Sequence, residues 1–159
     1  MGTGRILLGG AAGIVAKDLI LQGAVAAGWA RYDLWAILAR PLLGGEMVPF
    51  TISWSVAATG FLLHLAIGMV WAGLVELARP WWLPLLARSR GAAWLALVNT
   101  AVIWTGWGLG FPALGLGPAP WALGPLTTAI TLASDLAYSL VLAVTLTVAG
   151  VALPAGPAQ

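Results

Sequence analysis

Five polar side chains that could carry chemistry lie inside long apolar stretches of the sequence: Lys17, Asp18, His64, Asn99 and Asp135. An ammonium group, carboxylates and an imidazole can bind and release protons, and inside membranes such groups form relays for protons or small ions. A charge at mid-bilayer costs on the order of 3 kcal/mol even on lenient insertion scales, so these groups normally face the protein interior and find partners there. We call these five residues the polar layer and treat them as the candidate functional site.

Four apolar runs position the polar layer, and each is long enough to cross a bilayer, which needs about 20 helical residues. They cover residues 6–30, 52–77, 91–110 and about 127–149. Because each helical residue rises about 1.5 Å, position along a run converts to depth. Every run places a member of the polar layer at or near its middle. The sequence therefore predicts that the five side chains lie close to one plane.

The neighbours of the polar layer indicate which helix faces turn inward. In the second run, Gly60, His64 and Gly68 recur at intervals of four, which puts the imidazole between two small residues on one face. In the fourth run a polar stripe surrounds Asp135 at helical spacing, and its other members are Thr131, Tyr138 and Ser139. Close-packing G-x-x-x-G pairs also occur in the first and third runs, at Gly9 and Gly13 and at Gly106 and Gly110.

The charges of the polar layer restrict how it can pair. Lys17 contributes one positive charge and the two aspartates contribute two negative charges, so the layer is neutral only when His64 or one aspartate is protonated. Lys17 and Asp18 are about 100° apart around a helix and cannot face the same partner. We expect Lys17 to pair with Asp135, which leaves Asp18 to His64, Asn99 or an indole N–H. The alternative is that the polar layer has a structural role, in which its hydrogen bonds determine which helices pack against each other.

The composition defines the fold class. Of 159 residues, 61% are apolar and 8% are charged, which cannot build the polar shell of a water-soluble domain. The predicted fold is all-α: an integral membrane bundle of four transmembrane helices, with a short interfacial helix over residues 31–40 after the first span. Pro41 is expected to end that short helix. Residues 1–150 form a single domain in this interpretation, and residues 151–159 form a short tail.

The remaining connections are also predicted from residue types. The Arg- and Trp-containing segment 79–90 suits a loop partly sunk among lipid headgroups, whereas residues 111–126 contain four Pro, three Gly and no charge and suit neither a regular helix nor a solvated loop. Most of the ten Trp map to span ends, where interfacial belts are expected. Those belt positions are Trp29, Trp35, Trp54, Trp81, Trp82, Trp94, Trp107 and Trp121, and only Trp71 and Trp104 lie deeper.

Several function classes are excluded or disfavoured. The chain has no Cys and a single His, too few ligands for a zinc site, an iron–sulfur cluster or a bis-His haem, and no cofactor is expected. It has no run of Lys or Arg that would bind nucleic acid. It also lacks the H-E-x-x-H, G-x-S-x-G, P-loop and G-x-G-x-x-G motifs, so we expect no enzymatic activity.

The distribution of Arg predicts the orientation. With four spans, the termini and the second connection share one side and carry four Arg, whereas the other two connections carry Arg31 and Arg40. This bias places both termini in the cytoplasm of a cell whose inner membrane holds the protein.

Short motifs are similar to those of a known group. Residues 9–14 (GGAAGI) followed by Lys17 and Asp18, then Arg31-Tyr32-Asp33, then His64 with Gly68, and an apolar Pro-containing connection before the fourth span resemble small four-span membrane proteins of unknown function from Firmicutes-type bacteria. The resemblance covers about residues 6–148. It implies the four-span topology and transfers no catalytic residue.

Two functions follow as hypotheses. The first is helix–helix association among membrane lipids, as a homo-oligomer or as an accessory subunit of a larger membrane complex. Short loops and the uncharged segment 111–126 suit such a partner surface. The second is a proton or small-ion pathway that uses the polar layer as relay groups. A wet path to Asp135 or His64 would favour the pathway, whereas a dry and mutually paired layer would favour association.

Overall fold

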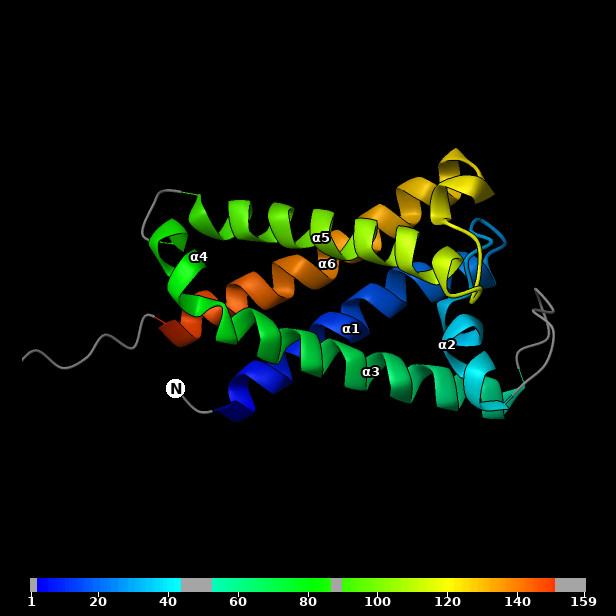
Figure 1. Ribbon diagram of the computed structural model, residues 1–159, viewed down its shortest axis with the longest axis horizontal. Coiled ribbons are helices and arrows are strands. Elements are labelled where there is room, and N and C mark those ends of the chain that lie inside the picture. The colour runs from blue at the N-terminus through cyan, green and yellow to red at the C-terminus, as the bar shows by residue number, and fades with distance from the viewer. Residues whose placement is uncertain (1–2, 44–52, 87–89, 151–159) are drawn as a thin grey trace, which may run out of the picture.

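Four long helices make up most of the computed structural model, which describes residues 3–43, 53–86 and 90–150. All elements in these ranges are helical, and the four long helices have the length and apolar composition needed to cross a membrane. Figure 1 shows them running alternately back and forth, so that the first and last helices have their chain-terminal ends on the same side. The long helices are α1 (Thr3–Ala26), α3 (Trp54–Leu77), α5 (Gly91–Ala113) and α6 (Pro125–Gly150). The predicted tail, 151–159, lies outside the described residues.

The short helix expected after the first span is present as α2 (Leu34–Leu43), but the prediction that Pro41 ends it is wrong. Pro41 lies inside the last turn, where it removes one backbone hydrogen bond. Buried Leu34 and Ile37 hold the helix against the rest of the chain. Burial of this apolar face therefore outweighs the cost of the proline.

A second short helix, α4 (Arg79–Leu86), replaces the loop expected after the second span. Its first turn contains Pro80, a position where the missing N–H costs little. The indole of Trp82 is buried and donates a hydrogen bond to the backbone carbonyl of Val75 at 2.5 Å. The tryptophan thus folds α4 back onto the end of α3 instead of lying in an interfacial belt.

The uncharged segment 111–126 also has more order than its composition predicts. Its first residues extend α5 to Ala113, three residues past the expected end, and a short 3₁₀ helix, η1, covers Pro120–Leu123. The ring of Trp121 lies over Gly108, where a Cβ atom would collide with it, and is 5.0 Å from the ring of Trp104 between centroids. The segment is therefore anchored to its own chain at Phe111, Ala119 and Pro120, which are buried, while half of its residues remain exposed.

The packing of the long helices is centred on α1 and α6. These two helices have the largest mutual contact, α3 packs against α1, and α5 packs against α6. Glycines permit the close approaches: a Cβ atom at Gly10 would lie 2.6 Å from the carbonyl oxygen of Gly68, and one at Gly13 would lie 2.7 Å from the ring of Tyr138. The predicted G-x-x-x-G pair of Gly9 and Gly13 thus contacts α6, and Gly10 beside it contacts α3.

Helix α2 is held against α3 at Gly60, where an added Cβ atom would overlap the backbone of Trp35. Backbone atoms cannot move aside as a flexible side chain can. We therefore expect Gly60→Ala to lower the free energy of unfolding by about 1–3 kcal/mol, the usual cost of overpacking. Reversible unfolding in mixed micelles, followed by circular dichroism, would measure it.

Gly73→Ala is the matched control, because Gly73 lies in the same helix and an added Cβ atom there meets nothing within 4 Å. This variant should be unchanged or stabilised by up to about 1 kcal/mol, since Ala is the better helix former. Equal stability of the two variants would contradict the close contact at Gly60.

Candidate functional site

The centre of the polar layer is an ion pair between Lys17 of α1 and Asp135 of α6. The Lys17 ammonium group donates to Asp135 Oδ1, and each residue is 4% exposed. Residues 118 positions apart in the sequence are thus joined between the two helices that pack most extensively. This is the pairing that the charge pattern favours.

Asp18 faces a different set of partners from its neighbour Lys17. His64 Nδ1 of α3 lies 2.8 Å from Asp18 Oδ1, and the indole N–H of Trp35 donates to Asp18 Oδ2 at 2.9 Å. Both carboxylate oxygens are therefore occupied, by the imidazole and by an indole, two of the partners expected for Asp18. Trp35 belongs to α2 and thus joins this short helix to the polar layer.

Asn99 of α5 completes the layer through its side-chain amide. Its oxygen accepts from the indole N–H of Trp71 in α3 at 2.9 Å, and its nitrogen donates to Ser139 Oγ in α6 at 2.9 Å. Asn99 is therefore not a partner of Asp18. The amide links α5 to α3 and α6 by two hydrogen bonds, and it is separate from the Lys17–Asp135 and Asp18–His64 pairs.

The polar stripe of α6 contacts every other long helix. Beyond Asp135 and Ser139, Thr131 accepts from the indole N–H of Trp104 in α5 at 3.3 Å, and the Tyr138 hydroxyl donates to the Gly68 carbonyl in α3 at 2.9 Å. All four stripe residues are buried. Helix α6 therefore holds Lys17 and Asn99 of the polar layer, and the two deep tryptophans are hydrogen-bonded within the chain.

Two small cavities flank Lys17. One has a volume of about 10 Å³ and is also lined by Tyr32, Ser134 and Asp135. The other, of about 20 Å³, is also lined by His64 and Tyr138. Trp107 lines both cavities, so this half-buried residue belongs to the site.

Tyr32 is the site residue that the sequence analysis missed. It lies between α1 and α2, is 4% exposed, and its hydroxyl has no hydrogen-bond partner among the described residues. Burial raises the pKa of this phenol, and the negative charge of Asp135 raises the pKa further. The hydroxyl therefore remains a proton donor at physiological pH. Its neighbours Arg31 and Asp33 gave no signal that Tyr32 turns inward.

Chemically, the site consists of two adjacent acid–base pairs that are closed off from solvent. Among the described residues, no group of three or more His, Asp or Glu side chains gathers as a metal-binding cluster. Each member of the polar layer has at least one partner within the chain, and none is more than 8% exposed. The arrangement can hold charges and share protons within itself.

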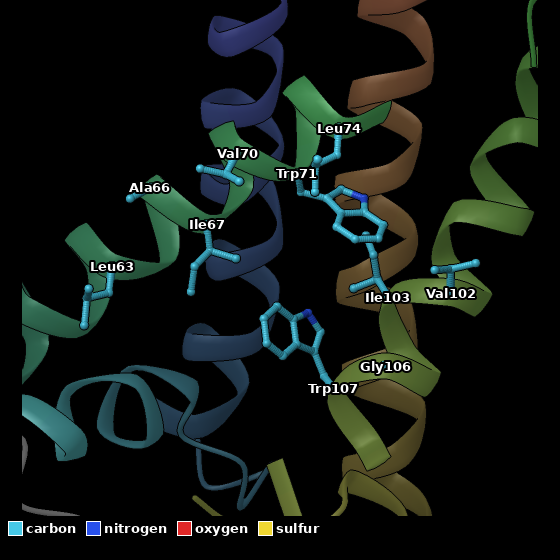
Figure 2. A pocket seen from close by; sticks show the side chains of 10 residues that line it. All are labelled: Leu63, Ala66, Ile67, Val70, Trp71, Leu74, Val102, Ile103, Gly106 and Trp107. Atoms are coloured by element: carbon cyan, nitrogen blue, oxygen red, sulfur yellow. The ribbon is translucent and has the colours of Figure 1, made fainter. Parts of the chain in front are cut away.

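An apolar groove of about 480 Å³ lies between α3 and α5. Figure 2 shows Trp71 from α3 and Trp107 from α5 extending into the space between these helices. Ile67, Ile103 and both tryptophans line this groove and also the cavity beside His64. One layer of side chains therefore separates the groove from the charged groups.

No protein-family model, curated protein or solved structure matches the chain. The resemblance to small four-span membrane proteins therefore stays a prediction.

The ion pair makes a prediction about stability. Lys17→Met leaves the Asp135 carboxylate buried without its cation, which should cost about 3–5 kcal/mol of unfolding free energy. The double variant Lys17→Met/Asp135→Leu removes both charges and should recover most of that loss. Micellar unfolding of the two variants and the parent tests this, and a double variant as unstable as the single one would argue against a buried pair.

The charge count makes a second prediction. At pH 7 we expect the polar layer to be neutral, with one proton held either by His64 or by one of the carboxyls of Asp18 and Asp135. Because the chain has a single His, ¹⁵N-histidine labelling reports on His64 alone. Infrared spectra of the parent, Asp18→Asn and Asp135→Asn would identify a protonated carboxyl. A neutral imidazole together with two ionised carboxylates would show the prediction to be wrong.

Proposed function

We propose that this chain is a bundle of four transmembrane helices that works by helix–helix association, either with further copies of itself or as an accessory subunit of a membrane complex. The observation that carries the proposal is the apolar groove between α3 and α5. These two helices pack against α1 and α6 but are not a packed pair themselves. A further transmembrane helix placed there would complete the packing around the core.

The residues along the groove suit a helical partner. Val70 and Val102 line it and are 64% and 52% exposed, so they offer apolar contact area. Gly106 also lines it, and a Cβ atom at Gly106 or Gly110 would meet nothing within 4 Å. Gly9, Gly10 and Gly13 of α1 are used in contacts within the chain, whereas this G-x-x-x-G pair of α5 remains open. Such pairs allow transmembrane helices to approach closely.

The condition of the polar layer supports association over an ion pathway. A pathway needs groups that exchange ions or protons with water on both sides. In the described residues the two charged pairs are closed, and the cavities beside them, at about 10 and 20 Å³, have room for about one water molecule each. Charges that are paired with each other inside the bundle are typical of a layer that fixes helix positions.

The membrane setting belongs to the same proposal. We place the four long helices across a bacterial inner membrane, with lipids around them and both termini in the cytoplasm, because the Arg bias favours that side. We also propose that the protein is non-enzymatic and is related to the small four-span proteins of Firmicutes-type bacteria.

Cysteine crosslinking in native membranes tests the proposal directly, because the chain has no Cys of its own. With Cys introduced by Val102→Cys, a homo-oligomer that uses the groove should give a disulfide-linked dimer under mild oxidation. An accessory subunit should instead give a heavier adduct with a different chain after treatment with a thiol-reactive photocrosslinker.

Val15→Cys is the control, since Val15 lies near the middle of α1, is 44% exposed and does not line the groove. It should give no such product. Two results would count against association through the groove. One is that both Val102→Cys and a second groove variant, Val70→Cys, stay monomeric, and the other is that Val15→Cys crosslinks equally well.

A further inference from the structure

The hydroxyl of Tyr32 is a buried polar group without a protein partner. Tyr32 is 4% exposed, and no described residue accepts or donates a hydrogen bond at its oxygen. A buried hydroxyl that makes no hydrogen bond is destabilising, because it has given up its bonds to water. The position of this hydroxyl therefore calls for a ligand.

The cavity that Tyr32 lines has the size of one small molecule. Its volume is about 10 Å³, close to the space that one water molecule occupies in a protein interior. Lys17, Ser134 and Asp135 share its lining with Tyr32. The lining also contains Leu21, Leu34 and Pro120, so polar groups form one part of an otherwise apolar wall.

The polar groups around the cavity retain unused hydrogen-bonding capacity. Lys17 donates one of its three N–H groups to Asp135 Oδ1, and a carboxylate oxygen can accept more than one hydrogen bond. The Ser134 hydroxyl donates to the Thr131 carbonyl, which leaves its oxygen free to accept. A buried water typically makes two to four hydrogen bonds, and this set supplies them.

We propose that the protein binds one internal water molecule that bridges the Tyr32 hydroxyl to the Lys17–Asp135 ion pair. A sodium ion of similar size would lie beside the Lys17 ammonium group and be repelled by it, whereas water is neutral and both donates and accepts. Through this water the connection between α1 and α2 becomes part of the charged site, and Tyr32 is a positioning residue for Asp135. The inference does not depend on the proposed function.

Isotope labelling can test this inference in the full chain, because the sequence contains one Lys and two Tyr. The protein is reconstituted in deuterated lipid bilayers with labelled Lys and Tyr, and proton-detected solid-state NMR follows magnetisation transfer from water. The expected result is rapid transfer from a bound water to both the Tyr32 hydroxyl and the Lys17 ammonium group.

Tyr32→Phe should remove the signal of the Tyr32 hydroxyl and shift the Lys17 resonance. It should also lower the folding equilibrium constant by about tenfold, which is the effect of losing a typical hydrogen bond. Tyr138→Phe is the control, because that hydroxyl bonds directly to the Gly68 carbonyl, and it should leave the transfer to Tyr32 intact.

A lack of water transfer to Tyr32 in the parent protein would overturn the inference, as would a direct Tyr32–Asp135 contact without water. The parent measurement decides the matter even when Tyr32→Phe fails to fold. A folded Tyr32→Phe variant that is more stable than the parent would also contradict a bound water.

Discussion

An ammonium group and a carboxylate that leave water together lose several kcal/mol of hydration each, and they recover it only while the two charges remain in contact. The Lys17–Asp135 pair imposes this condition on α1 and α6, because neither side chain reaches water. A rotation of either helix, or a slip along its axis, would separate the charges. Electrostatics thus fixes a register that apolar side chains alone would leave open, since Leu, Ile and Val can interdigitate in many registers.

The other contacts of the site are arranged around that register. Adjacent residues of α1 point in different directions, so while Lys17 holds α6, Asp18 holds α3 through His64 and α2 through Trp35. Gly60 and Gly68 bring α3 close enough for these bonds. Small residues and polar residues therefore act together: the glycines remove the volume that would keep the helices apart, and the polar groups select which faces meet.

The sequence predicts the four long helices and the Lys17–Asp135 pair because both follow from properties that can be counted, namely apolar length and charge. The end of α1 shows where counting fails. The apolar run continues to Ala30, but the helix ends at Ala26, where Gly28 adopts a φ of 75° and the chain turns. The roles of Trp35 and Tyr32 could not be predicted either, because they depend on how α2 folds back over α1. The groove likewise depends on which helices become neighbours.

The separation of the paired charges along the chain has a consequence for how the protein is made. Lys17 is synthesised 118 residues before Asp135, an interval of roughly 6 to 24 s at ordinary translation speeds. His64 is synthesised before Asp135 and can pair with Asp18. No residue of the described site supplies an anion for Lys17 until Asp135 has been synthesised. The burial of Lys17 is therefore a late step of folding, because its ammonium group gains its counter-ion only after Asp135 has been synthesised.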